Sequence, residues 1–124
     1  APRVVGVLDW ELSTLGHPLA DLAHLLTAFD FTPDQLGGIA GLDRAALGLP
    51  ERAEVVADYR AAGGDPSALG PFHRAFALFR FSVIFEGITA RAKAGLAASE
   101  DAERVGGLSA ASAARAAEVV AGRI

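Results

Sequence analysis

The stretch FHRAFALFRFSVIFEGITARAKAG, residues 72–95, carries the clearest pattern in this chain. Pro71 before it suits a helix start and Gly95 suits a helix end, so the sequence predicts a helix over about 71–94. At about 100° per residue, its apolar side chains fall on two opposite faces. One face holds Phe72, Phe76, Phe79 and Val83, and the other holds Leu78, Phe81, Phe85, Ile88 and Ala92. Two apolar faces predict a central helix packed between two layers.

Shorter helices are expected on both sides of this one. Helical spacing of apolar residues predicts helices over about 18–30, 51–62 and 108–122. Residues 31–49 are rich in Gly, Pro and Asp, which predicts a long loop with one helical turn around 43–47. Loops of this length are often functional lids or substrate loops, which makes this loop a candidate for substrate contact. The family resemblance described below implies the same for the long helix.

The segment between the long helix and the last helix is short and acidic. Ser99 is expected to cap it, and the pair Gly106-Gly107 is expected to break it before the final helix begins. The charged residues Asp101, Glu103 and Arg104 are interpreted as a solvated surface.

The stretch VVGVLDWELSTLGHPLADLAHLL, residues 4–26, poses the functional question. Its valines and leucine predict one short buried strand near 3–8, which needs partner strands that the chain does not supply. Asp9 ends this strand, and Asp21 follows twelve residues later in a new apolar pattern. The pair could form a metal or phosphate site. Alternatively, Asp9 is an ordinary strand end and Asp21 is one polar residue of a helix.

Composition limits the class of protein. The 124 residues suit one domain, and 52% hydrophobic with 21% charged residues allow a real core. A net charge of -4 argues against a broad nucleic-acid interface, and no apolar run is long enough for a membrane span. Cysteine is absent and no signal peptide is recognisable, so we expect a cytoplasmic protein. The chain begins two residues before the expected strand, which suggests that it was cut from something longer.

Three segments in order resemble one family. GVLDWELSTLGHPLADLA (6–23), GLPERAEVVADYRAAGG (48–64) and the long-helix stretch (72–95) resemble the aminoglycoside phosphotransferase family, whose members are built like protein kinases. The nearest subgroup is similar to the kinase-like domains attached to some acyl-CoA dehydrogenases. The resemblance implies a mainly α fold: the helical C-terminal lobe of a protein-kinase-like fold with one short N-terminal strand. Residues 1–124 would then be a single partial domain, without the N-lobe and the catalytic loop.

The resemblance also implies roles for the acids. Asp9 matches the kinase Asp that holds Mg²⁺ against the phosphates of ATP, while Asp21 and Glu11 would give structural support around it. His17 departs from the family pattern, in which an Asp there would cap the next helix better. No catalytic residue is expected in this chain, because the family's catalytic loop, His-Gly-Asp…Asn, would lie upstream of residue 1.

The long helix carries a narrow basic stripe. His73, Arg80 and Arg91 fall within about 20° of one another around the helix. They could contact an anionic part of a substrate, such as a phosphate or carboxylate. The alternative, which we favour, is that the arginines are half-buried and pair with nearby acids, of which the candidates are Asp58, Glu86 and Asp21.

Two functions remain open from the sequence. The first is the C-terminal portion of an ATP- and Mg²⁺-dependent phosphotransferase acting on a hydroxyl of a small molecule, inactive alone, with no nucleic-acid or membrane partner. The second is a non-catalytic helical interaction or oligomerisation module, in which an exposed apolar surface joins copies of the chain.

Overall fold

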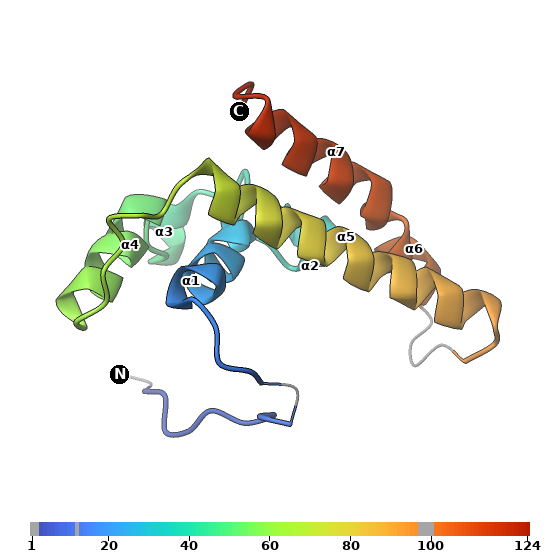
Figure 1. Ribbon diagram of the computed structural model, residues 1–124, viewed down its shortest axis with the longest axis horizontal. Helices are drawn as coiled ribbons and strands as arrows, with labels where there is room; N and C mark the ends of the chain where they lie inside the picture. Colours follow the sequence, from blue (N-terminus) through green and yellow to red (C-terminus); the bar gives the residue numbers. More distant parts are fainter. Residues whose placement is uncertain (1–2, 12, 97–100) are drawn as a thin grey trace.

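The computed structural model describes residues 3–11, 13–96 and 101–124. Within them the chain is helical, with the long helix at the centre (Figure 1). The elements in order are α1 (Pro18–Leu26), the 3₁₀ helix η1 (Thr27–Phe29), α2 (Pro33–Leu36), α3 (Arg44–Leu47), α4 (Arg52–Ala61), α5 (Pro71–Lys93), α6 (Ala102–Gly106) and α7 (Leu108–Val120). The mainly α fold class expected from the sequence is confirmed.

The expected helices form, and one more helix lies in the expected loop. This additional helix, α2, has Thr32 as its N-cap, whose backbone N–H donates to Gln35 Oε1 at 3.1 Å. Its C-cap is Gly37, whose φ of 65° is a conformation that glycine adopts without strain. The cap expected at Ser99 lies outside the described residues.

The strand expected at residues 3–8 is wrong for this chain. Residues 3–10 adopt no regular secondary structure, no described residue pairs with them as a strand, and Val4, Val5 and Leu8 are 84–87% exposed. A strand forms only where a neighbour accepts and donates its backbone hydrogen bonds, and the helical remainder of the described chain has no such edge. The segment therefore runs apart from the helices (Figure 1).

Helix α5 is the central element, because α7, α6 and α1 all contact it. Leu78 and Phe85 on its inner face are 0% and 1% exposed. They belong to a buried cluster made of Phe31, Ala75, Leu78, Phe85, Ala116 and Val119. Burying each large side chain of this kind stabilises the fold by about 1.5–3 kcal/mol, so this face holds α7 in place.

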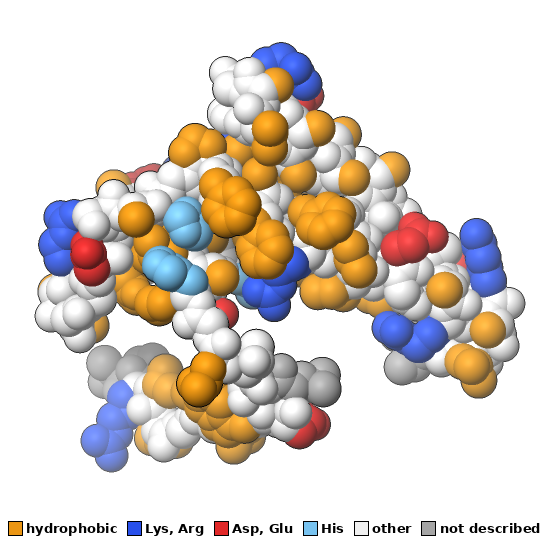
Figure 2. Space-filling view, in the orientation of Figure 1, with side chains coloured by type: hydrophobic (Ala, Val, Ile, Leu, Met, Phe, Trp, Pro, Cys, Tyr) orange, Lys and Arg blue, Asp and Glu red, His pale blue; other side chains and the backbone are white. Residues whose placement is uncertain are grey.

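The opposite face of α5 is open, which corrects the expected packing between two layers. Phe72, Phe79 and Val83 are 72%, 54% and 55% exposed. Figure 2 shows hydrophobic side chains gathered along α5 on this side. The described part of the chain covers one apolar face and has no layer for the other. Although α5 has 23 residues, no described helix is long and apolar enough to cross a membrane.

A second cluster joins α1 to α4. Leu19, Leu22 and Leu26 of α1 are buried, and they pack against partly buried residues that include Val56 and Tyr59 of α4. The link between α4 and α5 lies against the same cluster through Leu69. Because α1 also contacts α5, it ties α4 to the central helix.

The glycine pair between α6 and α7 has a packing role that its sequence did not suggest. Gly106 is the last residue of α6 and lies against α5. A Cβ at Gly106 would lie 3.1 Å from the backbone nitrogen of Thr89, closer than side-chain atoms normally approach. Glycine is therefore needed here for the close contact between α6 and α5, in addition to any effect on where α6 ends.

Two phenylalanines of α5 test whether only one of its apolar faces is covered. We expect Phe85→Ala to lower the free energy of unfolding by about 3–5 kcal/mol, because it removes a buried ring. We expect Phe79→Ala, on the open face, to change it by about 0.5 kcal/mol or less. Urea unfolding followed by circular dichroism measures both, and similar losses would show that the open face is covered in solution.

His24 links α1 to the central helix, and its surroundings shift its pKa. Its ring stacks on Phe81 with centroids 4.6 Å apart, and its Nδ1 is buried without a hydrogen-bond partner among the described residues. Burial lowers the pKa of His24, Arg80 lowers it further, and Asp21 partly opposes them. The neutral imidazole is thus the form that suits the folded state.

This lowered pKa gives a pH dependence of stability. The unfolded chain, with a histidine pKa of about 6.5, binds a proton more readily than the folded chain does. The contribution of His24 is therefore full above about pH 6.5 and is lost as the pH falls below it. We expect His24→Phe, which keeps the aromatic stack, to make stability fall less between pH 7.5 and 5.5 in urea titrations. An unchanged pH slope would contradict the inference.

Candidate functional site

The N-terminal segment forms a tight turn that presents Asp9. The indole Nε1 of Trp10 donates to the carbonyl oxygen of Val7 at 2.8 Å. The N–H of Ser13 then donates to the carbonyl oxygen of Trp10 at 2.9 Å. These local bonds fold the chain back at Asp9, whose carboxylate is exposed.

Asp9 has an unusual backbone. Its φ is 69°, and among the described residues it is the single non-glycine with a positive φ. This left-handed conformation is uncommon for residues with a Cβ, although Asp tolerates it better than most. Such outliers are concentrated at functional sites, where they aim a side chain in a required direction.

The other two acids of this region lie exposed. Glu11 follows the turn, and Asp21 lies in the first turn of α1. No group of three His, Cys, Asp or Glu side chains in the described residues could enclose a metal ion. Asp9 could therefore supply one ligand, while the remaining ligands would come from water, phosphate or another part of a protein.

His17 caps α1 despite its departure from the family pattern. Its Nδ1 accepts from the backbone N–H of Leu19 at 3.3 Å. The ring lies 5.8 Å from that of His73, whose Nδ1 accepts from the N–H of Gly70 at the start of α5. The structure thus brings two histidines together as caps of two helices.

The basic stripe on α5 does not form one site. His73 is half-buried and bonded to the backbone, whereas Arg80 and Arg91 are exposed. At 1.5 Å per residue, His73 and Arg91 lie about 27 Å apart along the helix, too far for one small ligand. The ion pairs expected as the alternative are also not found among the described residues for either arginine.

A different charged cluster, which the sequence did not reveal, surrounds Asp30. The Asp30 side chain is 4% exposed, and Oδ1 lies 2.5 Å from Arg74 Nη2 while Oδ2 lies 3.1 Å from Arg52 Nη2. Arg115 Nη1 donates to the backbone carbonyl oxygen of Asp30. One buried carboxylate is thus shared by α4 and α5, and α7 is bonded to the same residue.

The signal for this cluster was present but was not recognised. Asp30 lies between Phe29 and Phe31 directly after the apolar face of α1, where a charge needs a buried partner. The guanidinium carbon of Arg52 lies 5.2 Å from the centre of the Phe29 ring, a distance typical of a cation–π contact. Periodicity alone did not show which arginine would reach Asp30.

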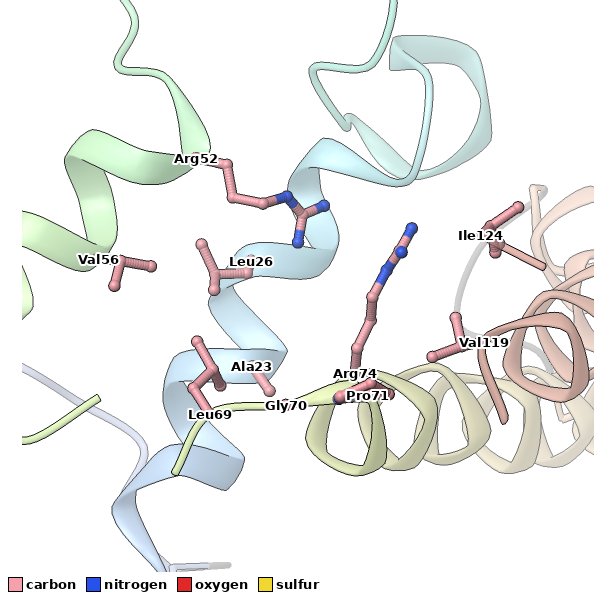
Figure 3. A pocket seen from close by; sticks show the side chains of 10 residues that line it. All are labelled: Ala23, Leu26, Arg52, Val56, Leu69, Gly70, Pro71, Arg74, Val119 and Ile124. Carbon is pink, nitrogen blue, oxygen red and sulfur yellow. The ribbon is translucent and has the colours of Figure 1, made fainter. Parts of the chain in front are cut away.

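Two arginines of this cluster, Arg52 and Arg74, border an open pocket of about 280 Å³. In Figure 3 the guanidinium groups of Arg52 and Arg74 converge from α4 and α5, and apolar side chains form the walls. The apolar lining residues are Ala23, Leu26, Val56, Leu69, Pro71, Val119 and Ile124.

Comparison with known proteins places this helical arrangement in a family. A crystal structure of a Ralstonia eutropha protein assigned as an aminoglycoside phosphotransferase matches with a TM-score of 0.87 and 40% identity, over 98% of this chain and 37% of the other. The acyl-CoA dehydrogenase family member 11 of Rattus norvegicus is 41% identical over 80% of this chain, and member 10 of Mus musculus is 37% identical over 86%. The chain spans 13% and 10% of the length of these two relatives.

The family model agrees with these relatives and with the resemblance found in the sequence. The model of the phosphotransferase enzyme family matches residues 1–75, which include the Asp9 turn, α1 and α4. This match covers more than half of the chain. The chain therefore belongs to the phosphotransferase enzyme family.

Proposed function

We propose that this chain is the C-terminal portion of an ATP- and Mg²⁺-dependent phosphotransferase that acts on a hydroxyl of a small molecule. The observation that carries the proposal is the left-handed backbone of Asp9 inside the segment that the family model matches. Asp9 is exposed in this turn, and no hydrogen bond or ion pair of its side chain is found among the described residues. Strain without a packing reason favours a functional role.

The chemistry of Asp9 fits Mg²⁺ bound with ATP. Mg²⁺ prefers hard oxygen ligands and usually keeps several waters, so one or two carboxylates and the phosphates of a nucleotide suffice. The absence of a three-ligand cluster among the described residues agrees with a shared site of this kind. When bound, the ion would neutralise charge on the transferring phosphoryl group.

The other acids would support this site rather than take part in the reaction. Asp21, exposed near the start of α1, is free to accept hydrogen bonds from a neighbouring loop, and Glu11 flanks the turn. The base that accepts the proton of the hydroxyl is proposed to lie outside this chain, so the chain alone is expected to be inactive. A cytoplasmic location remains part of this proposal.

Substrate contact is proposed for the helical surface of this lobe. Arg80 and Arg91 are exposed cations on α5, and each could meet an anionic group of a substrate separately. His73 is less suited, because its Nδ1 already accepts from Gly70. We expect a small hydroxylated molecule and not a nucleic acid, since the net charge is -4.

Asp9→Ala tests the metal role in a protein that carries this segment together with the rest of the family's fold. We expect Mg²⁺-dependent ATP affinity, measured by isothermal titration calorimetry, to fall at least tenfold, because loss of even an outer partner of a metal ligand has such effects. The isolated chain should show no saturable ATP binding.

The matched control is Asp58→Ala, which removes an equally exposed carboxylate from α4. It should leave both ATP affinity and its Mg²⁺ dependence unchanged. If Asp9→Ala also leaves them unchanged in a correctly folded protein, Asp9 holds no metal and the proposal is wrong.

A second candidate, a non-catalytic oligomerisation module, is favoured by the open face of α5. Phe72 and Phe76 stack on this face with ring centres 6.0 Å apart, which makes a flat apolar surface. A contiguous surface of this kind commonly marks an interface. For this candidate the occupant is a second copy of the chain, whereas for the phosphotransferase it is the remaining 63% of the fold, since the chain covers 37% of the solved relative.

Sedimentation velocity separates the two candidates. A module predicts concentration-dependent dimers that Phe76→Asp disperses, because a charge cannot be buried unpaired in an apolar contact. Leu47→Asp, at an exposed leucine of α3, is the control and should leave the dimer intact. A chain that stays monomeric at all concentrations would rule out the module.

A further inference from the structure

We infer that the pocket between α1, α4, α5 and the C-terminal end of α7 is a binding site for a short-chain aliphatic monocarboxylate. The inference does not depend on phosphate transfer, because the pocket includes none of the residues assigned to that function. It follows from three features, which are the charge at the pocket, the polar atoms there that lack hydrogen-bond partners and the apolar walls.

The charge of the side chains at the pocket is not balanced. Arg52 and Arg74 both border it, and they share the single carboxylate of Asp30. This leaves one positive charge in excess, and Arg115, bonded to the backbone of Asp30, adds further positive charge nearby. A ligand with one negative charge would balance the two pocket arginines.

The polar atoms of the cluster are also not fully used. Arg74 Nε is a donor that is buried without a hydrogen-bond partner among the described residues, whereas Asp30 Oδ2, which also has none, is an acceptor that a carboxylate ligand cannot satisfy. Arg52 reaches Oδ2 at ion-pair distance, but the alignment is not that of a hydrogen bond. Buried polar atoms normally have partners, and a carboxylate can accept from guanidinium N–H groups in pairs. The side chains of Arg52 and Arg74 are 37% and 33% exposed, so a ligand can reach them.

The walls of the pocket define the rest of the ligand. Leu26, Val56 and Leu69 line one side and Val119 lines the other, so a chain extending from the arginines meets apolar side chains (Figure 3). The volume of about 280 Å³ lies near the lower limit for ligand pockets, which restricts the chain to a few carbons. A short aliphatic chain that carries one negatively charged group matches both the arginines and the apolar walls.

Calorimetric titration of the purified protein with sodium hexanoate tests the inference. We expect one site with a Kd on the order of 1 mM, as suits a ligand of so few atoms. Acetate lacks the chain and 1-hexanol lacks the charge, so each should bind at least about tenfold more weakly. If acetate binds as tightly as hexanoate, the site recognises only the negative charge. If 1-hexanol binds as tightly as hexanoate, the site is only an apolar surface. Either result overturns the inference.

Variants locate the site. Arg74→Gln should weaken hexanoate binding at least about tenfold, while Arg60→Gln, at an exposed arginine of α4 away from the pocket, should not change it. Arg74→Gln also removes an ion-pair partner of the buried Asp30 and so lowers the stability of the fold. Val56→Phe gives an independent test, because it keeps both arginines and fills space beside the apolar wall. Val56→Phe should abolish binding, and its melting curve checks that the variant remains folded, because Val56 also packs on α1. Hexanoate binding that survives both variants, or that is absent from the folded wild-type protein, overturns the inference.

Discussion

The arrangement of the whole chain depends on how α5 buries one of its two apolar faces. Leu78 and Phe85 are almost fully buried, and the elements that cover them are contributed from both ends of the chain. Phe31 follows α1 and η1, while Ala116 and Val119 belong to α7. Because these partners are far apart in sequence, their contacts with α5 determine where α1 and α7 lie relative to each other. Helix α6 also contacts α5 directly, and α4 joins this frame through α1.

A buried charge stabilises the same frame and limits how it can change. Asp30 reaches Arg52 from α4 and Arg74 from α5, so one carboxylate connects two helices that the apolar clusters hold only indirectly. Removing one partner of a buried ion pair leaves a charge without compensation, which costs several kcal/mol. The requirement for charge near Asp30 therefore explains why arginines, with their long and forked side chains, lie at the border of an otherwise apolar pocket.

The sequence predicted those features that depend on nearby residues. Apolar spacing and prolines at first turns located α1, α4, α5 and α7, because these signals act within a few residues. The strand at 3–8 was wrong because strand formation depends on a partner, and spacing cannot show whether one exists. Likewise, the sequence showed two apolar faces on α5, but it could not show that the described chain covers only one of them.

The candidate sites show the same difference between features that nearby residues determine and features that only the fold determines. Asp9 could be selected from the sequence because a family motif surrounds it, although its left-handed backbone could not be foreseen. The Asp30 cluster joins residues 22 and 44 positions apart, so only the fold brings them together. Arg80 and Arg91 share a face of one helix, yet their distance along the axis prevents a common small ligand. Angular position on a helix predicts which side chains face one way, and axial distance decides whether they can act together.

The Asp9 turn and Asp30 lie before and after the helical segment formed by α1 and η1. The twelve residues 18–29 of this segment span roughly 18 Å if counted as helix. A small ligand in the pocket therefore cannot touch Asp9, and a metal at Asp9 cannot offset the excess charge beside Asp30. Any influence of one site on the other would have to pass through α1, whose buried leucines pack on α4 and hold its position. If both proposed sites exist, this separation predicts that a variant can lose metal binding at Asp9 with an intact pocket, or the reverse.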